Sequence, residues 1–199
     1  MRFLAAIAAL LLLATAASAA EVPSATDAPA EPVVPAYVGS AVCADCHAEE
    51  TEAWATSHHA HAWTEATPDN VRADFDGTTF EGNGMSVRFR IEDGRYHADV
   101  TESDGSRRDY AVHSVVGIEP LQQYLYETEP GRLQSFDVVW DTEKGGWFHL
   151  YEGQELPPSD GLHWTGPYKN WNARCAECHA TGYEKNFDQT TATYASTQT

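Results

Sequence analysis

Two copies of one short pattern account for every cysteine in this chain. CADCH begins at Cys43 and CAECH begins at Cys175, and each copy closes with a histidine, His47 or His179. Four cysteines in a secreted chain ordinarily predict two disulfide bonds. Because each Cys-x-x-Cys pair is followed at once by histidine, the spacing predicts instead that both copies carry out the same chemistry.

The Cys-x-x-Cys-His pattern is the attachment signature of haem c. Two thiols at this spacing can each form a thioether with one haem vinyl group, and the next residue places an imidazole below the iron. The sequence therefore predicts two covalently bound haem c groups. Their thioether and proximal residues are Cys43, Cys46 and His47 for one, and Cys175, Cys178 and His179 for the other.

A zinc site built from the two cysteine pairs is the main alternative. Zinc needs no histidine directly after each pair, and an oxidising compartment would threaten its thiols. Two local disulfides or a redox-active dithiol account for the histidines no better. We therefore favour haem attachment.

The N-terminus predicts export. Arg2 precedes an apolar run, residues 3–14, and small residues then lead to a cleavage site after Ala19 or Ala20. A retained anchor is the alternative, but this run is short for a membrane span and no later run is longer. We expect a periplasmic or extracellular protein with no membrane span after cleavage.

The net charge of the chain excludes some classes of binding partner and favours others. The formal net charge of −18 becomes −19 once Arg2 is removed with the signal peptide. Such a surface repels nucleic acid and anionic lipid, so neither is expected as a partner. It favours basic redox partner proteins or cations, although the same charge would also serve solubility alone.

The chain divides by composition, and the division predicts an α+β fold. Two haem-binding helical or irregular segments flank an antiparallel β-meander insert of about five or six strands, which Gly-bearing turns separate. The segment from residue 40 to 66 lacks proline and glycine, so it predicts one helix or two separated by a bend. The expected parts are a signal peptide (1–19), a Pro/Ala-rich linker (20–36), the first haem-binding helical segment (37–66), the β-rich insert (67–155), the second haem-binding segment (156–187) and a polar tail (188–199).

The sequence also restricts which residues could be the sixth ligand of each haem iron. After signal cleavage only Met85 remains as a methionine ligand, and its place at the start of a strand favours ordinary packing. At least one haem is therefore bis-histidine or open. Seven of the nine histidines lie outside the motifs, namely His58, His59, His61, His97, His113, His149 and His163.

The cluster SHHAHAW contains the most suggestive candidates. If residues 43–61 form one straight helix, His58 lies about 16 Å beyond His47 along the axis, so both imidazoles cannot bind one iron. Either the helix bends sharply, or His58 and His59 serve the second haem or one in another subunit. The plain alternative is that these two and His61 are solvated surface histidines.

The remaining histidines differ in their surroundings. His163, in GLHWTG, lies near the second motif and is the second candidate. His149, in WFHLY, sits in an apolar strand, where ligation and a backbone-bonded core role are equally open. His97 and His113 fall in strands remote in sequence from either motif, so we expect no ligand role for them.

Six stretches of the chain carry a family resemblance. They are YVGSAVCADCHAEETEAWATSHHAHA, GIEPLQQYL, GRLQSFDVVWD, WFHLY, LHWTG and NWNARCAECHATGYEKNFD. Together they resemble the exported multihaem c-type cytochromes related to the tetrahaem cytochrome of ammonia oxidisers. The resemblance is closest to the branch often fused to tetratricopeptide repeats, and it spans residues 37–188.

This resemblance implies electron transfer through closely packed haems that are mostly bis-histidine ligated. The family's S-x-H-A-x-A element begins here at Ser57 and favours His59 as a distal ligand, and its LHWTG element favours His163. The reserve distal candidates are His58, His149 and His61.

The chain also departs from the family pattern. Members usually carry a further Cys-x-x-Cys-His soon after YEKNFD, so both a natural two-haem form and a fragment stay open. We expect an exported dihaem cytochrome that transfers single electrons and is not an enzyme. The alternatives are a haem enzyme with one open iron that acts on a small nitrogen species or peroxide, and a subunit of a polymeric cytochrome filament made of copies of this chain.

Overall fold

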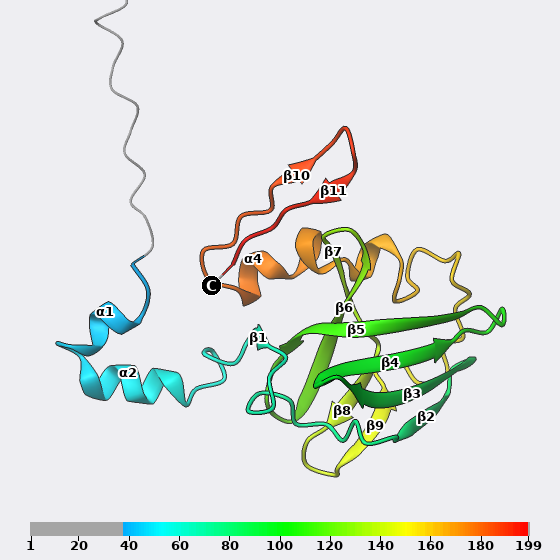
Figure 1. The fold of residues 1–199 in the computed structure, drawn as a ribbon, viewed down its shortest axis with the longest axis horizontal. Helices are drawn as coiled ribbons and strands as arrows, with labels where there is room; N and C mark the ends of the chain where they lie inside the picture. The colour runs from blue at the N-terminus through cyan, green and yellow to red at the C-terminus, as the bar shows by residue number, and fades with distance from the viewer. Residues whose placement is uncertain (1–37, 199) are drawn as a thin grey trace, which may run out of the picture. The chain divides into compact units, whose positions relative to one another are not determined.

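The computed structural model describes residues 38–198, and most of the regular secondary structure in them is antiparallel β-structure (Figure 1). The expected signal peptide (1–19) and linker (20–36) lie outside the described residues. The helices are α1 (Ala41–Ala44), α2 (Ala48–Ala55), the 3-10 turn η2 (Pro167–Lys169), α3 (Trp171–Arg174) and α4 (Ala176–His179). The strands are β1 (Thr64–Glu65), β2 (Thr79–Gly82), β3 (Met85–Glu92), β4 (Arg95–Thr101), β5 (Arg107–Val116), β6 (Leu121–Glu129), β7 (Arg132–Ser135), β8 (Val138–Asp141), β9 (Gly146–His149), β10 (Phe187–Asp188) and β11 (Thr193–Tyr194).

The predicted meander is present. In the described part of the chain, one sheet of nine strands has the order β2-β3-β4-β5-β6-β8-β9, with β1 paired to β5 and β7 paired to β6. Every pairing is antiparallel. The strand number exceeds the expected five or six because the stretch RLQSFDVVW breaks at Phe136 into β7 and β8, and because β2 and the very short β1 also join the sheet.

The two ends of this sheet approach each other. Trp147 Nε1 on β9 donates to Thr78 Oγ1 beside β2 at 3.0 Å. Asn83 Nδ2, in the β2–β3 turn, lies 3.1 Å from His149 Nδ1 and donates to the Tyr151 carbonyl oxygen at 2.7 Å. These side-chain bonds curl the sheet into a nearly closed barrel around its core.

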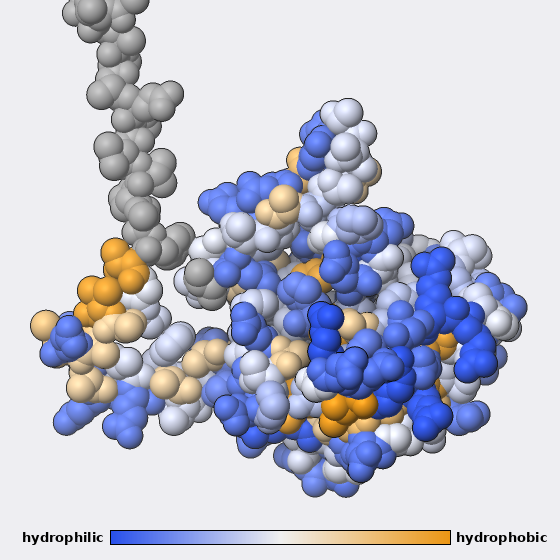
Figure 2. Space-filling view, viewed as in Figure 1, coloured by the Kyte–Doolittle hydropathy of each residue, from blue (hydrophilic) through white to orange (hydrophobic). Residues whose placement is uncertain are grey.

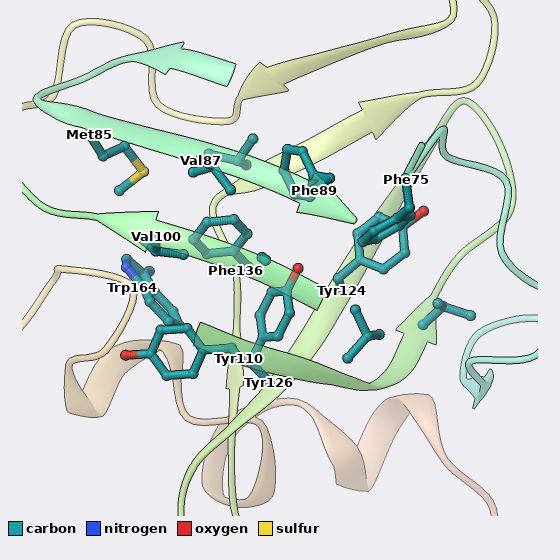
Figure 3. Close-up of a cluster of buried hydrophobic side chains, with 14 residues drawn as sticks. Phe75, Met85, Val87, Phe89, Val100, Tyr110, Tyr124, Tyr126, Phe136 and Trp164 are labelled. Carbon is teal, nitrogen blue, oxygen red and sulfur yellow. The ribbon is translucent and has the colours of Figure 1, made fainter. Parts of the chain in front are cut away.

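Aromatic residues dominate that core (Figure 3). Phe75 makes edge contacts with Phe89 and Tyr124 at centroid distances of 5.4 and 5.2 Å, the geometry that ring quadrupoles favour. Met85 is buried in the same cluster, at 8% exposure, so the structure assigns it the packing role that its strand position favoured.

The first helical segment is shorter than the sequence of residues 40–66, which lacks proline and glycine, predicted. Two helices form, as one of the two expectations had it, but α2 ends at Ala55 and turns follow. The Thr56 hydroxyl bonds back to the Ala53 carbonyl oxygen at 3.3 Å, and Ser57 Oγ bonds back to Trp54. Such local side-chain bonds compete with helix continuation. The α+β expectation is thus right only in part, since the fold is mostly antiparallel β with few short helices.

The polar tail contains a short hairpin that its sequence does not indicate. The strands β10 and β11 form it, and Phe187 pairs with Tyr194. Asp188 Oδ1 accepts the Thr190 amide at 2.7 Å and shapes the turn. Two residue pairs are too few to leave an alternating pattern in the sequence, which explains why the hairpin was missed.

Candidate functional site

The first Cys-x-x-Cys-His motif forms a helical turn that begins in the last residues of α1 and ends just before α2. The amides of His47 and Cys46 donate to the Cys43 carbonyl oxygen at 2.9 and 3.2 Å. His47 then precedes α2 with a non-helical backbone conformation. All three side chains are exposed, and both thiols are free. Two thiols and an imidazole are therefore accessible on one turn, as covalent haem attachment requires.

The second motif repeats this turn. The amides of His179 and Cys178 donate to the Cys175 carbonyl oxygen at 3.2 and 3.1 Å. Cys175 differs from its counterpart because it is partly buried, and burial raises the pKa of its thiol. The Trp171 ring lies 5.9 Å from the His179 ring. The two motifs thus share a backbone geometry but not an environment.

The second motif is fixed firmly to the sheet. Trp171 and Ala176 are buried in a cluster with Leu125 and Leu133 of β6 and β7. Asn172 Oδ1 accepts the Leu133 amide at 2.8 Å, which satisfies a buried donor. The α3–α4 segment consequently lies beside β7 (Figure 1).

A cavity of about 800 Å³ connects the two motifs. Its lining includes Cys43 of the first motif, His179 of the second, and His59 from the turns after α2. Trp54 and Trp63 add aromatic surface to the wall. This volume falls within the range of roughly 300–1,000 Å³ that is usual for cofactor sites. The fold thus brings together three predicted site residues that are far apart in the sequence.

The wall that carries His59 is anchored to the sheet. Trp63 Nε1 donates to Ser114 Oγ on β5 at 2.9 Å. The His61 carbonyl oxygen accepts the Gly117 amide at 3.1 Å. Sequence reasoning gave Ser114 no role, because a serine inside a strand carries no signal of the tryptophan that it binds from 51 positions away.

The other two histidines of the cluster are placed differently. His58 is exposed, and its Nε2 lies 3.9 Å from Glu119 Oε2. Neither His58 nor His61 lines the cavity that His59 lines. The structure therefore distinguishes His59, which the family resemblance favoured, from its two neighbouring histidines.

His163 and His149 belong to a separate buried cluster. His163 is 3% exposed, with Nδ1 at 2.9 Å from Thr165 Oγ1 and Nε2 at 3.2 Å from Glu102 Oε2. His149 accepts the Tyr151 amide at Nδ1, and burial lowers the pKa of its imidazole. Both histidines line a small cavity that neither motif lines. A distal role for His163 stays a prediction, and it requires the bond to Glu102 to open.

The two strand histidines have partners near the sheet. His97 Nδ1 lies 3.2 Å from Asp109 Oδ2, and His113 Nδ1 lies 3.1 Å from Ser114 Oγ. Burial lowers the pKa of His113. Neither residue lines the cavity between the motifs.

The donor set fits haem c. All four thiols are free, and in each motif they precede an imidazole on the same turn. The cavity that the motifs share has aromatic walls, which suit a flat apolar macrocycle. Within residues 38–198, no three Cys, His, Asp or Glu side chains gather as they would around a metal ion.

Residues 42–85, which include the first motif, match the model of the family described as cytochrome c554 and c-prime. The match supports a relationship to c-type cytochromes. It covers less than a quarter of the chain and stops before the second motif, so the finer relation to tetrahaem cytochromes stays a prediction. Within the described range, no helix is long and apolar enough to cross a bilayer.

One solved structure is similar over a longer stretch. The crystal structure of outer cell wall cytochrome OcwA aligns with 81% of this chain and 29% of its own chain, at 20% identity and a TM-score of 0.47. This chain thus spans less than a third of that cytochrome's length, and a TM-score this low does not establish a shared fold. No curated protein matches the sequence.

Proposed function

We propose that this chain is an exported dihaem c-type cytochrome that transfers single electrons. The observation that carries the proposal is the cavity shared by Cys43 and His179, because it places the two attachment motifs around one space. Two redox groups attached at its opposite sides would lie close together. Closely spaced groups favour rapid passage of an electron from one to the other.

The axial ligands follow from the same cavity. His47 and His179 serve as proximal ligands, since each directly follows its cysteine pair. His59 lines the cavity that His179 also lines, and it serves as the distal ligand of the group that His179 holds. With this assignment His59 and His47 bind different irons, so the distance between them along the helical segment is no obstacle.

The surrounding residues tune this site. When bound, each haem supplies an iron that alternates between the ferric and ferrous states. Trp54 and Trp63 add apolar surface to the cavity, and lower local polarity shifts the reduction potential of a metal centre. The Trp63–Ser114 hydrogen bond holds one wall in place. The chain's own contribution is therefore attachment, ligation and burial rather than acid–base chemistry.

Haem counting tests the proposal directly. We expect exported protein to carry two haems per chain by pyridine haemochrome assay, and the Cys175→Ser/Cys178→Ser variant to carry one. The dithionite-reduced spectrum should not change when carbon monoxide is added if both irons are six-coordinate. A chain that binds zinc but no haem would refute the proposal, and a carbon monoxide shift in about half of the signal would favour the enzymatic alternative with one open iron.

A further inference from the structure

The helix pair α1–α2 is poorly covered by the rest of the described fold. Neither helix contains a buried residue. Val42 of α1 is 61% exposed and Trp54 of α2 is 46% exposed, and Val38 just before α1 is 72% exposed. The space-filling view shows hydrophobic colour gathered over α1 beside hydrophilic residues (Figure 2). An exposed apolar patch with a polar rim is typical of a protein–protein interface.

The rim of this patch carries one sign of charge. Exposed carboxylates occur at Asp45, Glu49, Glu50 and Glu52. The chain contains no lysine or arginine between residues 37 and 71. None of the four carboxylates forms an ion pair with lysine or arginine, and the contact of Glu50 is with His47 at 4.0 Å. No lysine or arginine nearby therefore neutralises the negative electrostatic potential of these carboxylates.

The residues around the second motif carry charges of both signs. Lys169 and Arg174 precede it and Lys185 follows it, interspersed with Glu177 and Glu184. Lys169 Nζ forms an ion pair with Asp137 Oδ1 at 2.9 Å. Charge thus distinguishes the two ends of the haem pair, although the two motifs are nearly identical in sequence.

We infer that α1–α2 is the docking surface for a basic, lysine-rich redox protein, which exchanges electrons with the haem held by the first motif. The inference rests on the proposed function. Val42 and Trp54 provide the apolar centre of the interface, and the carboxylates steer the partner and orient it. A second copy of this chain fits the surface poorly, because its own α1–α2 would bring the same carboxylates into opposition. In the transfer step, one electron leaves a ferrous haem of this chain and reduces the partner's ferric haem, and no atom or proton moves.

The test uses haem-loaded protein and a lysine-rich monohaem cytochrome c as the probe. Calorimetric titration at about 10 and 150 mM salt gives the Kd, and stopped-flow absorbance gives the electron-transfer rate constant. We expect binding that weakens as salt is raised, since screening shortens the reach of surface charge. Glu49→Lys/Glu52→Lys should weaken binding at low salt by about tenfold or more.

A matched variant separates the surface from the net charge. Glu143→Lys/Glu152→Lys changes the total charge by the same amount on exposed residues outside α1–α2, and it should change the Kd less than about twofold. Equal weakening by both variants, or no binding of the probe at all, would overturn the inference. So would a dimer in sedimentation velocity that only Glu49→Lys/Glu52→Lys alters, because the occupant would then be a second copy. The haem count of each sample is measured first, so that failure of the proposed function is recognised separately.

Discussion

At the scale of single residues, one asparagine connects the second motif to the sheet. Asn172 is 2% exposed. Its Oδ1 accepts the Leu133 amide, and its Nδ2 donates to the Gly131 carbonyl oxygen at 3.2 Å and to Ser196 Oγ at 3.0 Å. Gly131 has a positive φ of 72°, and a Cβ there would collide with the Tyr194 carbonyl oxygen. Both positions are therefore constrained by contacts that join β7, α3 and the C-terminal hairpin.

The adjacent pair His58 and His59 allows a sharp test at the same scale. Only His59 lines the cavity that contains His179, so His59→Ala should open one iron. We expect the reduced spectrum of this variant to shift with carbon monoxide in about half of its haem. His58→Ala is the matched control, because His58 faces Glu119, and its spectrum should not respond. The reverse pattern would show that the ligand assignment is wrong.

At the scale of elements, the two motifs sit on very different supports. The α3–α4 segment buries Trp171 and Ala176 against the sheet, whereas α1 and α2 bury nothing. The first turn of α2 places Glu49 and Glu50 near the helix N-terminus, where carboxylates interact favourably with the helix dipole. Short helices in water gain little stability by themselves, so α1–α2 depends on what packs against it.

The β8–β9 turn makes a pH-dependent contribution to stability. Asp141 accepts the backbone amides of Lys144 and Glu143 at 2.8 and 3.0 Å and the Lys144 ammonium at 3.0 Å. These bonds, that to the Lys144 amide first, lower the pKa of Asp141. Because the folded-state pKa lies below the unfolded value of about 3.9, the contribution is present above that pH and is lost as pH falls through the folded-state pKa.

Chemical denaturation of the Asp141→Asn variant measures this contribution. We expect the variant to be less stable than the wild-type protein at pH 7, and the difference to disappear near pH 2. Asn retains an acceptor oxygen, so the change isolates the carboxylate charge. A difference of the same size at both pH values would mean that the charge of Asp141 is not involved.

At the scale of the whole molecule, the main core is independent of the attachment motifs. Its cluster of buried residues comes from the strands, Phe75, Phe136 and Trp164, and it contains none of the motif cysteines or histidines. Phe89 and Trp147 stack within it at 3.5 Å between centroids. The sheet thus has its own hydrophobic core, and the residues of the candidate site lie outside that core.

A cysteine-free variant tests this independence. With Ser at the four cysteine positions the chain binds no haem, but we expect it to keep near-UV circular dichroism and a cooperative unfolding transition. Phe89→Ala provides the contrast, since emptying this fully buried position should cost about 3–5 kcal/mol. Loss of the transition in the cysteine-free variant would instead mean that the sheet needs the cofactor to fold.

Much of the fold was predictable because its signals are local. The runs that became β3, β4, β5, β6 and β9 are short, rich in Val, Tyr, Phe and Trp, and separated by turns, and a meander pairs mainly strands that are neighbours in the sequence. The β10–β11 hairpin and the early end of α2 were missed. They depend on two cross-strand residue pairs and on side-chain bonds at Thr56 and Ser57, which leave no periodic pattern.

The sequence by itself predicts which chemistry the chain carries, because two thiols and an imidazole on one turn form a pattern only five residues long. Only the tertiary structure shows which histidines lie near which motif. His59 reaches the cavity beside His179 because Trp63 and β1 are held on β5, and His163 is turned toward Glu102 inside a separate buried cluster. Such pairings depend on contacts between segments far apart in the chain, and no spacing within one segment records them.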